Sequence, residues 1–112
     1  MRGVRVLLLG LLLAACATAP DGDLVYNRLG PDEAQRADGV LQRALENYPS
    51  GRELAWRDPT TGVAGSVVPL RSFRTRSGRI CREFVETVAL GSVADRYRLT
   101  GCRDEAGIWR PR

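Results

Sequence analysis

The sequence predicts an α+β fold in which one N-terminal helix packs on a small antiparallel β-meander of four to five strands. Apolar residues recur at three- and four-residue spacing over residues 31–48, the period of a helix with one apolar face. From residue 52 onward, short runs rich in Val, Thr, Tyr and Phe alternate with turn sequences that contain Gly, Pro, Ser or Asp. Neither the helix nor the sheet can bury its apolar face alone, so the two are expected to pack together.

Residues 1–15 have the character of a cleavable export signal. Arg2 and Arg5 give the segment a positive start, and residues 6–15 contain only Val, Leu, Gly and Ala. A run of ten residues covers about 15 Å as a helix, about half the thickness of a hydrocarbon core. The run is therefore too short for a membrane span and is interpreted as a targeting segment.

Cys16 is predicted to carry the lipid anchor of the mature chain. The sequence Leu-Ala-Ala-Cys at 13–16 resembles the bacterial lipobox, in which cleavage occurs just before a cysteine modified with diacylglycerol. Residues 16–30 are interpreted as this lipidated cysteine, with palmitate as an expected acyl group, followed by a flexible tether. The alternative is an ordinary secretory signal that leaves Cys16 as a thiol. Ala17 stands where inner-membrane lipoproteins have Asp, so we expect an outer-membrane location, facing the periplasm or the surface.

Residues 31–112 are expected to form the single folded domain, beginning with a helix from about Pro31 to Tyr48. A proline and two acids suit the first turn of a helix, and Pro-Ser-Gly at 49–51 ends it. Gly39 lies inside it and costs about 1 kcal/mol relative to Ala, so the helix must depend on packing. The packing stripe is Ala37, Leu41, Ala44, Leu45 and Tyr48, with Leu41, Leu45 and Tyr48 expected to dock on the sheet.

Five strands are predicted near residues 53–57, 65–74, 79–90, 93–103 and 108–110. Turn sequences separate them at 58–62, 75–78, 91–92 and 104–107. Trp56 and Trp109, near the two ends of this region, are interpreted as core aromatics, with a ligand platform as the alternative.

The hairpin between the third and fourth predicted strands can be placed in register. A two-residue Gly-Ser turn at 91–92 pairs residues whose numbers sum to 183, and the numbers of Cys81 and Cys102 also sum to 183. Counted from the turn, the cysteines fall on a non-hydrogen-bonded pair, where Cα atoms lie about 4.5 Å apart. An even pair of cysteines in an exported chain predicts a disulfide, worth about 3 kcal/mol for a loop of about 22 residues.

The same register divides the side chains between two faces of the sheet. Phe84 and Glu86 fall on the core side, whereas Glu83, Arg96 and Arg98 fall on the other. A solvated sheet face is the ordinary interpretation of the second set. The alternative is that Arg96 and Arg98 belong to an anion-contacting face for lipid head groups or cell-wall polymer.

Composition excludes several classes of function. The 112 residues contain no His, and all seventeen basic residues are Arg. The commonest general base and metal ligand are thus absent, so we expect no catalytic residue, no metal and no cofactor. Zinc at Cys81 and Cys102, the alternative to a disulfide, would need carboxylate ligands. Without residues 1–15 the chain has 15 Arg against 13 acids, a net charge of +2, which does not indicate nucleic-acid binding.

Several short motifs over about residues 45–110 carry a family resemblance. They are Trp-Arg-Asp-Pro at 56–59, Thr-Gly at 61–62, Gly-Ser-Val-Val-Pro at 65–69, Gly-Arg-Ile-Cys-Arg-Glu-Phe at 78–84, Thr-Val at 87–88, Gly91, Gly-Cys-Arg at 101–103 and Gly-Ile-Trp at 107–109. Together they resemble the C-terminal domain of the surface antigen family, typified by seventeen-kilodalton outer-membrane antigen lipoproteins. The resemblance implies an outer-membrane lipoprotein and supplies no catalytic residue. Many members carry a glycine zipper before this domain, which this chain lacks, so no membrane-inserting role is implied.

These observations favour a noncatalytic envelope lipoprotein, a structural or binding module held at the membrane by its lipid anchor and contacting a cell-envelope polymer. The alternative is a periplasmic inhibitor or assembly factor that docks on a protein through an edge strand near residues 65–74. An enzyme is the least supported class, because Glu83, Glu86 and Asp95 are spread over both predicted faces and form no carboxylate pair.

Overall fold

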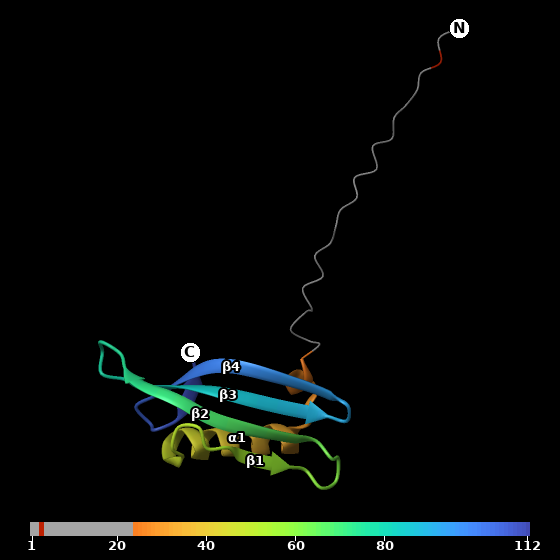
Figure 1. The fold of residues 1–112 in the computed structure, drawn as a ribbon, viewed down its shortest axis with the longest axis horizontal. Helices are drawn as coiled ribbons and strands as arrows, with labels where there is room; N and C mark the ends of the chain where they lie inside the picture. The colour runs from red at the N-terminus through yellow and green to blue at the C-terminus, as the bar shows by residue number, and fades with distance from the viewer. Residues whose placement is uncertain (1–2, 4–23) are drawn as a thin grey trace.

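The computed structural model describes residue 3 and residues 24–112 (Figure 1). The predicted lipidation site Cys16, residues 17–23 and all of the predicted signal except residue 3 lie outside the described residues. The chain order is η2 (Val25–Arg28), α1 (Pro31–Asn47), β1 (Leu54–Arg57), β2 (Ala64–Arg74), β3 (Ile80–Leu90), β4 (Val93–Arg103) and β5 (Trp109–Pro111). The strands form one antiparallel sheet in the order β1-β2-β3-β4-β5, and α1 lies along one face of it. The predicted α+β fold with a meander is confirmed.

The helix α1 begins and ends close to the predicted positions. Pro31 occupies its first turn together with the acids Asp32 and Glu33, and Tyr48 forms its C-cap in an extended conformation. These acids lie where the helix dipole favours negative charge. Between residues 24 and 112, no helix has the length and apolarity needed to cross a membrane.

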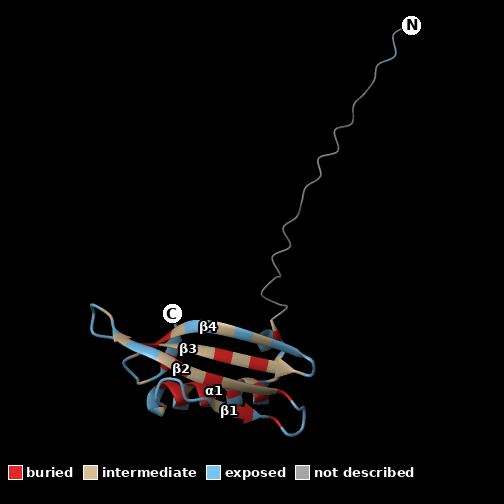
Figure 2. Ribbon diagram, viewed as in Figure 1, coloured by how far each residue is buried: buried red, intermediate tan, exposed pale blue. Residues whose placement is uncertain are grey.

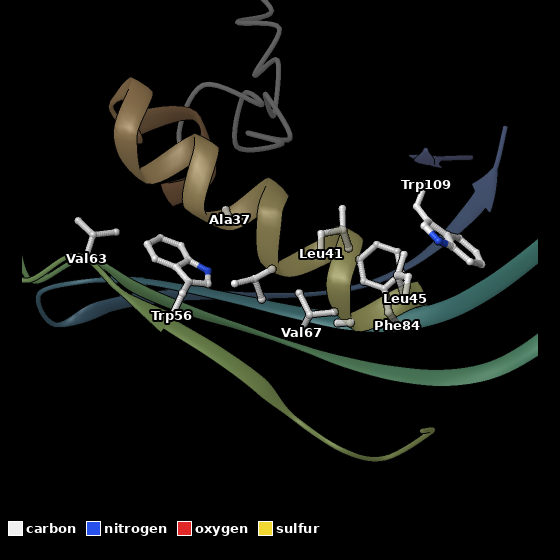
Figure 3. Close-up of a cluster of buried hydrophobic side chains, with 10 residues drawn as sticks. Ala37, Leu41, Leu45, Trp56, Val63, Val67, Phe84 and Trp109 are labelled. Carbon is white, nitrogen blue, oxygen red and sulfur yellow. The ribbon is translucent and has the colours of Figure 1, made fainter. Parts of the chain in front are cut away.

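The hydrophobic core lies between α1 and the sheet (Figure 3). Figure 2 shows buried residues along α1 and at alternate positions of β3, as expected for a sheet with one covered face. Trp56 and Trp109 are both buried in this core, which confirms their interpretation as core aromatics. The core residues are Ala37, Val40, Leu41, Ala44, Leu45, Trp56, Val63, Val67, Phe84 and Trp109.

Gly65 allows the close approach of Trp56 to the sheet. The two residues are paired across β1 and β2, and a β carbon on Gly65 would lie 2.5 Å from Trp56 Nε1 and 2.8 Å from the Thr87 carbonyl oxygen. No larger residue fits at this strand position without a shift of the backbone or the indole.

The predicted docking of the helix through Leu41, Leu45 and Tyr48 is correct for the two leucines only. Leu45 is 2% exposed, and both leucines belong to the core. Tyr48 is half-buried, and its ring lies 5.4 Å from the guanidinium carbon of Arg52. The backbone leaves the helix at Tyr48, with φ −90° and ψ 138°, so its side chain no longer continues the apolar stripe.

The folded part of the chain starts before the predicted helix. Val25–Arg28, within the range expected to be tether, form a short 3₁₀-helix that contacts β3 and β4. Val25 is fully buried, and its backbone N–H donates a 2.6 Å hydrogen bond to Asp95 Oδ2. We therefore place the beginning of the folded domain near Leu24 and not at Pro31.

The register of the β3–β4 hairpin is the predicted one. Leu90 pairs with Val93 across the Gly91-Ser92 turn, and pairing continues without a shift to Cys81 and Cys102. Gly91 has φ +61°, which suits the first central position of a tight hairpin turn. The irregularity in the sheet lies instead between β2 and β3, at 69–72, and it begins at a proline.

Candidate functional site

Within residues 24–112, one face of the sheet is covered by α1 and the opposite face has no covering helix. Phe84, Glu86 and Val88 of β3 point to the covered side and are buried. Residues at the intervening positions of β3 point to the opposite side and are only partly buried, apart from Cys81. Residues paired across neighbouring strands share a face, so the register assigns the side chains of the other strands as well.

The face without a covering helix carries a group of arginines, which we call the arginine face. Arg96 pairs with Thr87, Arg98 with Val85, and Arg110 with Cys102, which places all three there. Arg57 is placed there through Ala64 and Ala89. The side chains of Arg71, Arg98 and Arg110 are 66%, 70% and 67% exposed, so their guanidinium groups are accessible. The arginine face comprises Arg57, Arg71, Arg96, Arg98 and Arg110.

Glu83 is an acid in the middle of the arginine face. Its carboxylate accepts hydrogen bonds from Arg71 and Arg98, each at 3.3 Å, through its two different oxygens. The Arg71 and Arg98 guanidinium groups hold the pKa of this carboxyl below its ordinary value. Glu83 is therefore ionised at neutral pH and fixes one arginine on each side of itself.

Arg96 is placed differently from these two arginines. It is exposed, and no ion pair joins it to another residue of the described part of the chain. Arg110, at the other end of the face, pairs with Asp104 at 2.8 Å. Arg96 and Arg98, the two predicted anion-contacting residues, therefore lie on the same face. Glu83 compensates the charge of Arg98, whereas the charge of Arg96 faces solvent.

Cys81 and Cys102 form a disulfide between β3 and β4. Their Cα atoms are 4.0 Å apart, and the sulfurs lie on the side of the sheet that carries the arginine face. Cys81 is fully buried and Cys102 is 4% exposed. Phe73 pairs with Cys81 on β2 and therefore lies on the same side of the sheet. The centroid of its ring is 5.0 Å from the guanidinium carbon of Arg71. The bridge thus joins β3, the central strand of the sheet, to its neighbour β4.

The carboxylates weighed as catalytic candidates lie on different faces. Glu83 belongs to the arginine face, whereas Glu86 and Asp95 lie on the side of α1. Asp95 is engaged by the Val25 N–H. Glu86 is 6% exposed, and its burial, with a smaller contribution from the charge of Asp38, raises its pKa to about 7. Within residues 24–112, no group of three or more Cys, Asp or Glu could hold a metal ion.

The predicted edge strand near residues 65–74 is an interior strand at its beginning. β1 pairs with Ala64–Val67, so this half has neighbours on both sides. In the second half, Pro69 has no N–H to offer, and its carbonyl oxygen accepts the Gly51 N–H at 2.8 Å. The Leu70 carbonyl oxygen accepts the Ser50 hydroxyl at 2.6 Å. These contacts occupy the edge backbone at residues 69 and 70.

Comparison with known proteins places the chain in a family. The protein-family model described as "17 kDa outer membrane surface antigen" matches residues 43–110 of the 112. The chain belongs to this family. It is 37% identical over 105 residues to the 17 kDa surface antigen of Rickettsia bellii, covering 90% of this chain and 66% of that protein. It is 39% identical over 83 residues to the 17 kDa surface antigen of Rickettsia felis, covering 72% of this chain and 52% of that protein.

The chain thus spans between about half and two thirds of the length of these antigens. The resemblance to the surface antigen family is confirmed, and the matched region contains the whole sheet except the end of β5. No solved structure matches this family member.

The four consecutive residues Cys81-Arg82-Glu83-Phe84 have four different roles in this surface antigen domain. Cys81 forms the disulfide, Glu83 binds two arginines, and Phe84 fills the core. Arg82, paired with Gly101, points to the covered side and is 8% exposed. Its Nη1 donates hydrogen bonds to the carbonyl oxygens of the last turn of α1, at 2.9 Å for Leu45 and 2.7 Å for Tyr48.

Arg82 and Glu86 are buried charged residues whose environment sequence analysis did not predict. The predicted register placed Glu86 on the core side, and the same alternation along β3, which was the available signal, puts Arg82 there as well. Assigning their roles required the position of α1, because the partners of Arg82 are backbone atoms 34 and 37 residues away.

Proposed function

We propose that this protein is a noncatalytic, lipid-anchored module of the outer membrane, and that its arginine face contacts an anionic component of the envelope. The family description as an outer membrane surface antigen supports the location. Cys16, at the end of the signal-like segment, supplies the anchor in this proposal. The nature of the sheet face supports the binding role.

The observation that carries the proposal is the concentration of exposed arginines on a sheet face that no helix in the described part of the chain covers. An arginine offers a planar fork of donors that matches the oxygen atoms of phosphate or carboxylate. Glu83 orients Arg71 and Arg98 with one part of each guanidinium, which leaves further N–H donors on each. A repeated anion such as a phosphate-bearing lipid surface can contact several of these groups together.

Binding to vesicles tests the role of this face. The chain from residue 16 with Cys16→Ser removes the anchor, so that vesicle binding reports the protein surface alone. We expect it to bind vesicles that contain phosphatidylglycerol and not pure phosphatidylcholine, with affinity that falls as salt screens the charges. Replacing Arg96 and Arg98 by Gln should weaken binding by about thirtyfold, since each arginine near an anionic surface contributes about 1 kcal/mol and the two together contribute about 2 kcal/mol.

A matched variant distinguishes the effect of the arginine face on vesicle binding from the effect of net charge. Arg36 and Arg43 are exposed on α1, on the other side of the sheet, and replacing both by Gln removes the same charge. This variant should bind anionic vesicles as the parent does. Equal losses in the two double variants would show that net charge, and not this face, governs binding.

The anchor is tested by mass spectrometry of the wild-type protein taken from cell envelopes. A mature chain that starts at an acylated Cys16 is expected, and Cys16→Ser should give an unprocessed precursor or a soluble product. An intact mass that corresponds to an unmodified Cys16 at the start of the mature chain would disprove the lipid anchor.

A further inference from the structure

An apolar groove lies on the helix side of the sheet, away from the arginine face. Its volume is about 270 Å³. It exists because α1 packs over β1, β2 and β5, whereas η2 packs over β3 and β4, so that side chains between the two helices remain accessible. Its walls include Leu24, Leu41, Phe84 and Leu99, and its polar groups include those of Glu86 and Tyr97.

Glu86 is a buried acid without a partner in this groove. It is 6% exposed, and within residues 24–112 no group donates a hydrogen bond to its carboxyl and no cation pairs with it. The charge that acts on it is that of Asp38 on α1, which is also negative. A buried carboxylate without a compensating charge is costly. A positive group that enters the groove would therefore stabilise the ionised form of Glu86.

Tyr97 places a second polar atom in the same groove. Its hydroxyl is buried and lies near Asp95 and the backbone of Tyr26 without hydrogen-bond geometry to either within the described residues. It pairs directly with Glu86 across β3 and β4, so hydroxyl and carboxyl belong to neighbouring side chains on one face. Together they offer acceptors to a donor group that enters between apolar walls.

We propose that this groove binds an aliphatic primary ammonium ligand, with its chain along Leu41 and Leu99 and its ammonium group at Glu86 and Tyr97. An ammonium ion supplies the missing charge and three donors. A fatty acid is disfavoured, because its carboxylate would meet two negative groups, those of Glu86 and Asp38. The preceding residues of the chain are also a poor match, since residues 17–23 contain two Asp and no cation.

The size of the groove sets the probe. A groove of about 270 Å³ has room for a short aliphatic chain, so octylammonium is the probe. The experiment titrates octylammonium into the chain from residue 16 carrying Cys16→Ser, and follows the methyl resonances of Leu41 and Leu99 by NMR. Saturable shifts of these methyl groups are expected, and octanol and octanoate should each bind at least tenfold more weakly.

The pH dependence and two variants identify Glu86 as the recognising group. Burial raises its pKa to about 7, and the facing tyrosines Tyr26 and Tyr97 have a pKa above the ordinary value of 10, so they stay neutral. Asp38 is the other charge acting on it. The affinity for octylammonium should therefore fall about tenfold from pH 8 to pH 6 as the carboxylate becomes protonated. Glu86→Gln should remove this dependence, whereas Glu53→Gln, at an exposed position, should keep it.

Two results would overturn the proposal. One is equal affinity for octanol and octylammonium in the parent chain, which would make the groove merely apolar. The other is an unchanged octylammonium affinity in a folded Glu86→Gln chain. Because the groove and the arginine face lie on opposite sides of the sheet, either result leaves the vesicle-binding test of the proposed function unaffected.

Discussion

The guanidinium group of Arg82 lies 2.7 Å from the carbonyl oxygen of Tyr48 and holds the C-terminus of α1 on the sheet. The last turn of α1 contains no basic residue of its own. A positive charge at this end of a helix complements both its dipole and its unpaired carbonyl groups. Here β3 supplies that charge, so one side chain links the helix to the central strand.

Replacing Arg82 by Met should lower the free energy of unfolding by about 2 to 4 kcal/mol, because buried carbonyl groups lose a charged donor. Arg82→Lys should lie between Met and the wild type, since it keeps the charge and loses the fork. Urea denaturation followed by circular dichroism measures both. Arg36→Met on the exposed side of α1 is the matched control and should stay within about 0.5 kcal/mol. Equal effects at the two positions would refute the capping role.

Replacing Cys81 and Cys102 together by Ala should lower stability by about 2 to 5 kcal/mol, because the bridge restricts the unfolded chain. Urea unfolding of the variant, compared with the oxidised parent, measures the loss. A nonreducing peptide map of protein from the envelope should show one peptide pair joined through these residues. Two free thiols in that map would contradict the bridge.

Leu45→Ala should cost about 2 to 4 kcal/mol, because Leu45 is 2% exposed and packs in the core between α1 and the sheet (Figure 3). Thermal and urea unfolding give the value. Ile108→Ala removes a comparable apolar side chain at a position that is 41% exposed, and should change stability much less. If both substitutions cost the same, the helix is not anchored through this core position.

Glu86 should make the domain less stable as the pH rises. Its pKa is raised from 4.5 to about 7 in the folded state, so the folded protein holds this proton more tightly than the unfolded chain. The stabilisation is complete below about pH 4.5 and is lost between pH 4.5 and 7, amounting to about 3 kcal/mol at about 1.4 kcal/mol per unit. Urea unfolding across this range should show the decline in the wild type, and Glu86→Gln should abolish this contribution. Glu53→Gln, with the same change in charge, should decline like the wild type.

Much of the sheet could be predicted because strand pairing depends on local rules. A Gly-Ser turn of two residues fixes Leu90 opposite Val93, and regular alternation then carries the register to Cys81 and Cys102 without further information. The same alternation placed Phe84 on the core side and Arg96 on the opposite side. The prediction holds because the irregular segment of the sheet lies in β2 and not in this hairpin.

Contacts between elements distant in the chain could not be predicted in this way. The fold of Val25–Arg28 depends on Asp95, which lies 70 residues beyond Val25, and no local pattern indicates that contact. Tyr48 has the spacing of the helix stripe, yet the chain turns away from the helix at that residue. In the same way, the helix pattern alone did not show that Arg82 caps α1.

The class of fold, the hairpin register, the disulfide and the two faces of the sheet follow from periodicity and turn length, which act within a few residues of the chain. The positions of α1 and η2 on the sheet depend on contacts between distant elements. These contacts bring Arg82 to the helix carbonyl groups and leave Glu86 in an apolar groove. The physical reason is that burial and electrostatic environment are properties of all the elements that surround a side chain.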